Sequence, residues 1–181
     1  MKVIKVEIEG LLIIQPDVFE DDRGFFFESF NAQKIKGAGL TESFVQDNLS
    51  KSTKDVLRGL HFQNPPFSQG KLVSVIRGSV LDIAVDIRKS SPTYGKHHAI
   101  ILSEQNKTQF YVPSGFAHGF KTLEDDTIFS YKCTNGYNKN SEGSIKWDDS
   151  DLNIDWQIEN PIVSEKDQVA PSFKDLNSQF S

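Results

Sequence analysis

The stretch LDIAVDI, residues 81–87, decides what kind of fold this chain can form. Its apolar residues stand at positions 81, 83, 85 and 87, and Asp, Ala and Asp stand between them. This period of two is that of a β-strand, because successive side chains of a strand point to opposite faces of the sheet. We therefore expect a strand with one apolar face and one polar or wet face.

The same period recurs along the chain. Ile4, Val6 and Ile8 alternate with charged residues near the N-terminus. Short apolar runs separated by clusters of Gly, Pro, Asn and Ser follow, and strands spaced in this way are typical of a sandwich or barrel. The further strands that we expect cover residues 56–63, 71–77, 99–102, 108–112 and 127–133.

Helical signals are few. Residues 31–36 precede Gly37, a common helix stop, and residues 164–170 begin at Ser164, a favourable N-cap, and end before Pro171. A length of 181 residues suits one domain. We expect a single domain over residues 1–181, with a C-terminal tail from about residue 172 that wraps the surface or packs on a partner.

The composition restricts the class of function. Twenty-five Asp and Glu against twenty Lys and Arg give a net charge of −5, which argues against a nucleic-acid-binding surface. The single Cys133 cannot form an internal disulfide, so a cytoplasmic location is expected. The longest apolar runs have four residues, whereas a membrane-spanning helix needs roughly 20. We therefore expect no nucleic-acid partner and no membrane contact.

The segment VLRGLHFQ, residues 56–63, carries more polar residues than packing requires. In an ideal strand Gly59 and His61 point to one face and Arg58 to the other. A bulge or bend at Gly59 would let Arg58 and His61 enter one pocket, because glycine often marks such a kink. The alternative is a surface arginine beside a buried, hydrogen-bonded histidine.

The segment PSGFAHGF, residues 113–120, resembles the second motif of the cupins. The resemblance implies an all-β fold, a cupin-type antiparallel jelly-roll barrel with a few short peripheral helices. Metal-binding cupins carry two histidines two residues apart and then a glutamate in their first motif, because a divalent metal needs several converging ligands. Here Gln63 follows His61 at that spacing, and Phe67 and Ser68 stand where the glutamate would be. We expect no metal site and a histidine free to act as a base.

Eight blocks of sequence, in order, resemble the dTDP-4-dehydrorhamnose 3,5-epimerase family. The resemblance runs from about residue 5 to about residue 171. It implies inversion at carbons 3 and 5 of dTDP-4-dehydro-6-deoxy-D-glucose on the way to dTDP-L-rhamnose, by a homodimer that uses no cofactor. The blocks are DDRGFFFESF (21–30), FVQDN (44–48), VLRGLHFQ (56–63), QGKLV (69–73), VDIRKSSPTYG (85–95), VPSGFAHGF (112–120), YKCTNGY (131–137) and SEGSIKWDD (141–149).

The implied chemistry explains why these residue types are needed. Hydrogens beside a ketone are acidic because the carbonyl oxygen can hold the electrons as an enolate. The resemblance implies that His61 is the base, that Lys71 stabilises the enolate and that Tyr131 returns a proton on the opposite face. An imidazole is largely neutral at pH 7, and a phenol is almost wholly protonated there. Without the resemblance, Tyr131 would be a half-buried strand aromatic and Lys71 a solvated charge.

The resemblance implies that Asp167 orients the catalytic histidine. A carboxylate in that position fixes the ring tautomer and favours the imidazolium that forms after proton abstraction. The local pattern Ser164-x-x-Asp167 also resembles a helix capping box. Orientation of His61 and capping of the helix both remain open from the sequence.

The resemblance further implies residues that bind the substrate, a dTDP-linked 4-keto-6-deoxy sugar. Arg and Lys suit the diphosphate or the sugar, although each could be an ordinary surface charge, and a tyrosine would stack on the thymine. Some contacts near the N-terminus come from the neighbouring subunit in the family, so the sites of the homodimer would be shared. The binding residues are Arg23, Glu28, Gln46, Asp47, Asn48, Arg58, His118, Tyr137, Glu142 and Lys166.

Three alternatives to the double epimerase remain. A relative that inverts only one of the two carbons could use the same His61, Lys71 and Tyr131. A catalytically silent sugar-nucleotide-binding protein would need no such acid and base pair. A metal-dependent cupin enzyme is disfavoured by Gln63 and Phe67, which replace two of the expected ligands.

Overall fold

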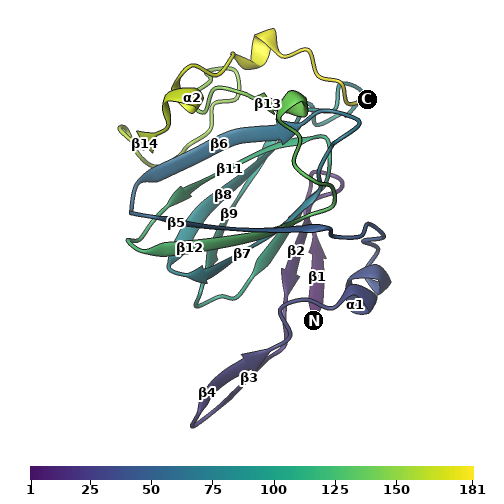
Figure 1. The fold of residues 1–181 in the computed structure, drawn as a ribbon, viewed down its shortest axis with the longest axis vertical. Helices are drawn as coiled ribbons and strands as arrows, with labels where there is room; N and C mark the ends of the chain where they lie inside the picture. The colour runs from purple at the N-terminus through teal and green to yellow at the C-terminus, as the bar shows by residue number, and fades with distance from the viewer.

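The computed structural model describes all of residues 1–181, and its main strands form two antiparallel sheets that pack face to face (Figure 1). The strands of the first sheet alternate between neighbours far apart in the sequence, as in a jelly roll. In spatial order this sheet contains β1 (Lys2–Lys5), β2 (Leu12–Gln15), β10 (Gln109–Val112), β7 (Lys71–Arg77), β12 (Thr127–Cys133) and β5 (Gln46–Ser52).

The second sheet covers the other side of the barrel. Its short strand β14 (Ile162–Val163) pairs with β6 in parallel, whereas all other pairs are antiparallel. The fold is the expected all-β, cupin-type antiparallel jelly roll with short peripheral helices. In spatial order the second sheet contains β13 (Glu142–Ser144), β6 (Val56–Gln63), β11 (Phe116–Thr122), β8 (Ser79–Asp86) and β9 (His97–Ser103).

The main core lies between the two sheets. Val73 and Phe110 of the first sheet pack there with Val80 of the second. The rings of Phe120 and Phe129 stack across the barrel with their centroids 4.1 Å apart. Large aromatic rings of this kind bury much apolar area and so hold the two sheets together.

Strand β8, which contains most of the stretch quoted first, is buried along its whole length. Leu81, Ile83 and Val85 belong to a second core that lies under residues 145–180. Asp82 and Asp86 have no exposed surface. The expected polar face therefore exists but is not wet, because the barrel encloses it and each carboxylate has hydrogen-bond partners inside.

The N-terminal strand is shorter than predicted. Strand β1 ends at Lys5, and residues 7–10 form a bend and a turn instead of continuing the alternation. Gly10 in this turn has a φ of +101°, which suits glycine. Turn geometry has therefore overridden the strand pattern at Val6 and Ile8.

Both expected helices are present and short. Helix α1 (Ala32–Gly37) has Asn31 as its N-cap, and helix α2 (Glu165–Gln168) has Ser164. Single 3-10 turns cover Lys139–Ser141 and Phe173–Asp175. No helix is long and apolar enough to cross a membrane.

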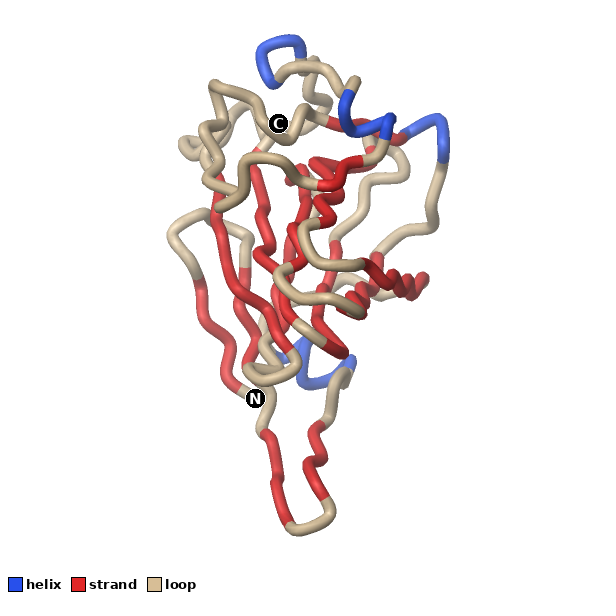
Figure 2. Tube along the Cα trace, turned by 90° about the vertical axis from the view of Figure 1, so that its left-hand side faces the viewer, coloured by secondary structure: helices blue, strands red, loops and turns tan.

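A hairpin of β3 (Val18–Asp21) and β4 (Gly24–Phe27) projects away from the barrel (Figures 1 and 2). Its Phe19 and Phe26 are 65% and 71% exposed. Two aromatic rings this open to solvent form an apolar surface of the kind that marks an interaction site.

The C-terminal tail wraps the barrel of its own chain. Phe173, Leu176 and Phe180 pack against the second core, on the outer face of the second sheet. The ring centroids of Phe62 and Phe180 lie 6.3 Å apart. The tail thus covers a surface that would otherwise expose apolar side chains of β6 and β8.

Candidate active site

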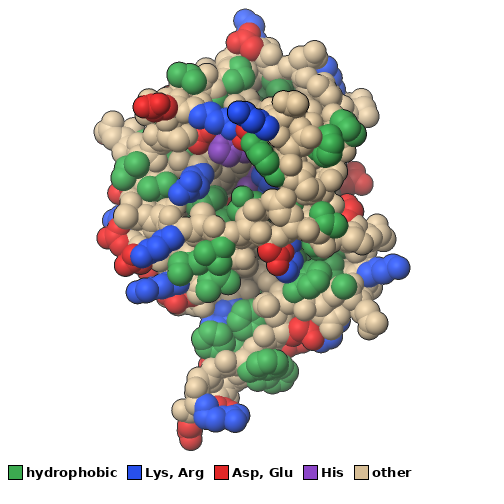
Figure 3. Space-filling view, in the orientation of Figure 1, with side chains coloured by type: hydrophobic (Ala, Val, Ile, Leu, Met, Phe, Trp, Pro, Cys, Tyr) green, Lys and Arg blue, Asp and Glu red, His purple; other side chains and the backbone are tan.

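A cavity of about 480 Å³ opens between the two sheets at one side of the barrel. Strands β5, β7 and β12 line one wall, strands β6 and β11 the other, and the segment of β14 and α2 closes one edge. Figure 3 shows the hollow, with histidine inside it and Lys and Arg around its rim. The expected catalytic residues His61, Lys71, Tyr131 and Asp167 all line this one cavity.

A β-bulge at Gly59 brings Arg58 and His61 into the cavity together. His61 pairs with His118 and Arg58 with Phe120, so two residues of β6 oppose one residue of β11. A Cβ atom on Gly59 would lie 2.5 Å from the Cα of Gly119, and its φ is +132°. The predicted bend at this glycine is confirmed, and no other residue fits the space.

His61 is held by Asp167. Its Nε2 lies 2.6 Å from Oδ1 of Asp167, whose side chain is almost fully buried. Burial alone would raise the pKa of Asp167, but hydrogen bonds from His61 and from the Gly59 N–H outweigh it and lower that pKa. Because an ionised carboxylate can only accept, Nε2 carries the proton and Nδ1 carries the lone pair.

Ser164 is the N-cap of helix α2. The Oγ of Ser164 accepts from the backbone N–H of Asp167 at 3.2 Å and so caps α2. The carboxylate of Asp167 does not reach back to close a capping box, since its oxygens accept from His61 and Gly59. The backbone N–H of Asp167 therefore takes part in the helix cap, whereas its carboxylate holds His61.

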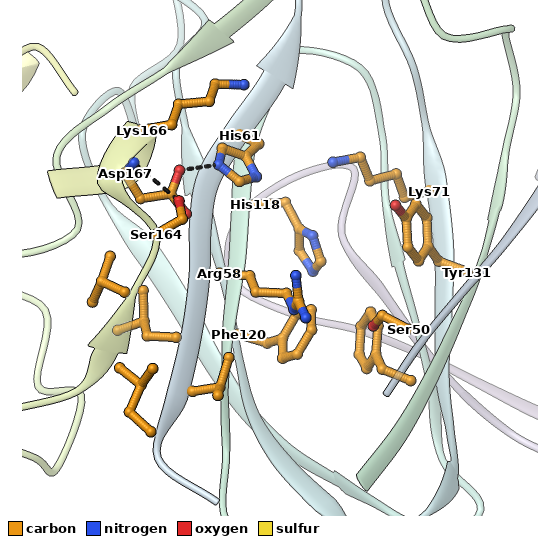
Figure 4. A pocket seen from close by; sticks show the side chains of 15 residues that line it. Ser50, Arg58, His61, Lys71, His118, Phe120, Tyr131, Ser164, Lys166 and Asp167 are labelled. Carbon is orange, nitrogen blue, oxygen red and sulfur yellow. Dashed lines mark hydrogen bonds and ion pairs between the residues drawn. The ribbon is translucent and has the colours of Figure 1, made fainter. Parts of the chain in front are cut away.

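Tyr131 and Lys71 face His61 from the other sheet (Figure 4). They lie on the neighbouring strands β12 and β7, where Lys71 pairs with Cys133 two residues beyond Tyr131. Burial raises the pKa of the Tyr131 phenol, which stays protonated at neutral pH. Burial lowers the pKa of the Lys71 ammonium, although the nearby Cys133 and Asp82 oppose the change.

Arg58 spans the cavity mouth. Its Nε and Nη2 both donate to the Oγ of Ser52 on β5, at 3.2 and 3.1 Å. The guanidinium is thereby fixed between the two sheets, and it adds a positive charge to the cavity without an acidic partner. This arrangement suits an anionic ligand.

His118 also lines the cavity and is held by a second buried carboxylate. Its Nε2 lies 2.9 and 3.0 Å from the two oxygens of Asp82, which has no exposed surface. Sequence analysis missed Asp82 because its partner depends on the pairing of β8 with β11. The only indication in the sequence was an aspartate on the polar face of a strand with clear hydrophobic alternation.

A polar recess adjoins the cavity and shares His61, Lys71 and Tyr131 with it. Gln46, Asn48, Tyr137 and Glu142, four of the expected binding residues, line this recess. The hydroxyl of Tyr137 donates to Glu142 at 3.2 Å. Lys166 also pairs with Glu142 and lines the main cavity, so the rim carries an ion pair between the two spaces.

Three expected binding residues lie outside both spaces. Asp47 points away because it alternates with Gln46 and Asn48 along β5, and it pairs with Lys132 on the outer face. Asp47, expected to supply a polar contact to the substrate, therefore lies outside the cavity and the recess of its own chain. Arg23 pairs with Asp21 at the hairpin tip, and Glu28 pairs with Lys34 near α1.

Gln63 holds a loop beside the recess. Its Nε2 donates to the carbonyls of Phe67 and Gly136, and its Oε1 accepts from the N–H of Asn138. No group of three or more His, Cys, Asp or Glu side chains gathers in a way that could hold a metal ion. At the position of a cupin metal ligand this chain therefore carries a structural amide.

The chain is similar to named proteins over nearly its whole length. The family model described as dTDP-4-dehydrorhamnose 3,5-epimerase matches residues 5–175. The enzyme of that name from Shigella flexneri is 53% identical, over 98% of each chain. The crystal structure of the enzyme of that name from Elizabethkingia anophelis is 55% identical, over 98% of each chain, with a TM-score of 0.93. The dTDP-6-deoxy-D-glucose-3,5-epimerase of Legionella pneumophila, solved with dTDP-4-keto-L-rhamnose, is 48% identical over 97% of this chain and 94% of its own, with a TM-score of 0.93.

Proposed function

The chain belongs to the dTDP-4-dehydrorhamnose 3,5-epimerase family, and we propose that His61, Lys71 and Tyr131 carry out the epimerisation in it. The reaction inverts the two carbons beside the ketone of dTDP-4-dehydro-6-deoxy-D-glucose. It needs a base for each carbon-bound hydrogen, a donor beside the ketone oxygen, and an acid on the opposite face of the sugar ring.

His61 is the base. With the proton on Nε2, its Nδ1 has the free lone pair that can take a hydrogen from carbon 3 or carbon 5. The ring becomes an imidazolium, and the ionised Asp167 beside it stabilises that charge. Asp167 is thus a positioning residue that also balances the charge of the intermediate.

Lys71 stabilises the enolate and Tyr131 protonates it. An ammonium beside the ketone oxygen gains energy as negative charge develops there, by about 3–4 kcal/mol in comparable oxyanion sites. Tyr131 keeps its proton in the buried cavity because burial raises its pKa. It can therefore give that proton to the carbon face that His61 does not reach, which inverts the centre.

The observation that carries the proposal is the arrangement of the cavity wall. The His61–Asp167 pair lies on the second sheet with α2, and Tyr131 and Lys71 lie across from it on the first sheet (Figure 4). A base and an acid on opposite walls are what inversion requires, since the proton must leave and return on opposite faces.

Deuterium uptake tests the proposal. In heavy water with dTDP-4-dehydro-6-deoxy-D-glucose, we expect deuterium at both carbon 3 and carbon 5 of the product by proton NMR. Uptake at one carbon would make the protein a single-site epimerase. Uptake at neither carbon, or full turnover by a His61→Ala variant, would overturn the catalytic assignment and favour a binding protein without catalysis.

The dTDP part of the substrate is assigned to the recess. Tyr137 offers an exposed ring for the thymine, and Gln46, Asn48 and Glu142 offer polar contacts beside it. Arg58, His118 and Lys166 line the main cavity, where a diphosphate and a sugar would need a positive charge and hydrogen bonds. The Legionella relative solved with dTDP-4-keto-L-rhamnose supports this class of ligand.

The active form is a homodimer with shared sites. The projecting hairpin exposes Phe19 and Phe26, and Arg23 at its tip has a 90% exposed side chain far from the cavity of its own chain. Contact with a second copy would cover the rings and bring Arg23 and Glu28 to the partner's site. The exposed aromatic surface of the hairpin supports this arrangement.

A further inference from the structure

A chain of three hydrogen bonds runs along the wall of the recess and ends at Cys133. The backbone N–H of Tyr137 donates to Oε1 of Gln46 at 2.9 Å. Nε2 of Gln46 donates to Oδ1 of Asn48 at 3.0 Å, and Nδ2 of Asn48 donates to Sγ of Cys133 at 3.5 Å. Cys133 is fully buried and has no part in the reaction described above.

The first of these bonds fixes the direction of all three. A backbone N–H can only donate, so the atom of Gln46 that meets Tyr137 must be its oxygen. The NH₂ group of Gln46 then meets Asn48, whose oxygen must accept. The NH₂ group of Asn48 is left to meet the thiol, and a sulfur atom can accept that bond.

The side-chain amides of Gln46 and Asn48 therefore each keep one N–H that these three hydrogen bonds do not use. Gln46 and Asn48 are inward-facing residues of β5, and both line the recess. A site that presents amide N–H groups beside the Lys71 ammonium favours acceptor oxygens, such as those of a phosphate or of a pyrimidine carbonyl.

We infer that Cys133 is a positioning residue for nucleotide binding: its sulfur holds the Asn48 amide so that Asn48 and Gln46 both turn an N–H toward an oxygen of the nucleotide. Without the sulfur, Asn48 can rotate or exchange its oxygen and nitrogen, and the donors lose their fixed direction. The inference rests on the proposed function, since it takes the recess as the site of the dTDP group.

Binding of dTDP alone, measured by calorimetry, tests the inference. We expect Cys133→Ala to weaken dTDP binding about 5-fold, the effect of one ordinary hydrogen bond. Cys133→Ser should restore most of the affinity, because a hydroxyl is also an acceptor. In the Asn48→Ala background, Cys133→Ala should cost nothing further, since the group that the sulfur holds is gone.

The outcomes separate this inference from the proposed function. If the unmodified protein does not bind dTDP, the nucleotide assignment fails. If it binds dTDP and Cys133→Ala binds equally well, the role of Cys133 is overturned. Equal losses in Cys133→Ala and Cys133→Ser, or additive losses with Asn48→Ala, would likewise overturn it, because a packing defect would not depend on an acceptor. Ser130→Ala, on the outward face of β12 next to Tyr131, serves as the control and should bind dTDP normally.

Discussion

The carboxylate of Asp167 determines which nitrogen of His61 carries the proton. We predict that Asp167→Asn lowers kcat by about 10²- to 10⁴-fold, because the new amide can donate to Nε2 and reverse the tautomer. The backbone N–H that Ser164 caps is unchanged in this variant. Steady-state kinetics and nitrogen NMR of the imidazole ring measure the two effects.

The matched control for Asp167 is Ser164→Ala, which removes the cap and keeps the carboxylate. It should lose about 1 kcal/mol of stability, a typical value for an N-cap, and less than tenfold in kcat. A loss of kcat as large as that of Asp167→Asn would mean that the helix end, and not the carboxylate, controls His61.

Lys71 and Tyr131 respond to burial in opposite directions, and the loss of the Lys71 charge affects the alkaline side of the pH profile. Burial lowers the pKa of Lys71 and raises that of Tyr131. Lys71 therefore loses its charge at a lower pH than an ordinary lysine, whereas Tyr131 keeps its proton to a higher pH than an ordinary tyrosine. We predict that Lys71→Arg, measured as kcat/KM against pH, is less active but no longer declines at the pH where the unmodified enzyme does. A decline at the unchanged pH would assign it to another group.

At the residue scale the sequence predicted the members of the site better than their partners. His61, Tyr131, Lys71 and Asp167 follow from the family resemblance and line one cavity. Asp82 and Ser52, which hold His118 and Arg58, could not be predicted from the sequence. The first contact depends on the pairing of β8 with β11, and the second on how β6 of one sheet faces β5 of the other.

The bulge at Gly59 shapes the part of β6 that lines the cavity. We predict that Gly59→Ala destabilises the protein by about 1–3 kcal/mol, since the added carbon would meet Gly119 and His118 and the φ is unfavourable. Gly37→Ala in α1 has open space around it and should be neutral or slightly stabilising. Urea unfolding measures both, and a Gly59→Ala variant as stable as the unmodified protein would contradict the close approach.

The loop after β8 is anchored on Asp86. Its carboxylate accepts from Arg88, Ser91 and Thr93. Burial alone would raise the pKa of Asp86, but these hydrogen bonds lower it from 3.8 to about 2. A folded pKa below the unfolded one adds stability that is complete above pH 3.8 and is lost as the pH falls through about 2.

We therefore predict that Asp86→Asn loses about 2 kcal/mol of unfolding free energy at pH 7. The difference from the unmodified protein should shrink as the pH approaches 2. Chemical unfolding at several pH values measures it. Asp151→Asn, at an exposed position of a turn, should show little change at any pH. An Asp86 difference that is constant with pH would mean that packing, and not ionisation, is lost.

At the scale of the element, most strands with a clear hydrophobic pattern were predicted, whereas a strand whose sequence is set by its surroundings was not. The strands at 56–63, 71–77 and 127–133 and both helices have the expected places. Strand β5 was missed because QDNLSKS carries few apolar residues, since its inner face lines a polar site and its outer face is exposed. A sequence built for a binding surface does not show the hydrophobic alternation of a packed strand.

At the scale of the whole molecule, the projecting hairpin is the part that the barrel of one chain does not explain. Its aromatic rings are exposed, yet its strands pair in regular antiparallel register. Lys107 lies 4.0 Å from the ring centroid of Phe25 and helps to hold the hairpin in this projecting position. A paired, projecting arm that ends in an arginine is suited to reach a second subunit.

A mixture of two defective variants tests whether the arm completes the partner's site. Arg23→Ala should impair both sites of a dimer, and His61→Ala should abolish base catalysis in both. A mixed dimer has one site that combines His61 of one subunit with Arg23 of the other. Equal mixing, followed by exchange of subunits between dimers, should therefore restore about a quarter of the full activity. The control is a mixture of His61→Ala with Tyr131→Phe, whose mixed dimers contain no intact site because both side chains line the same cavity of one chain. Activity of the first mixture no higher than the sum of its separate variants would contradict shared sites, since Arg23 would then act within its own chain or not at all.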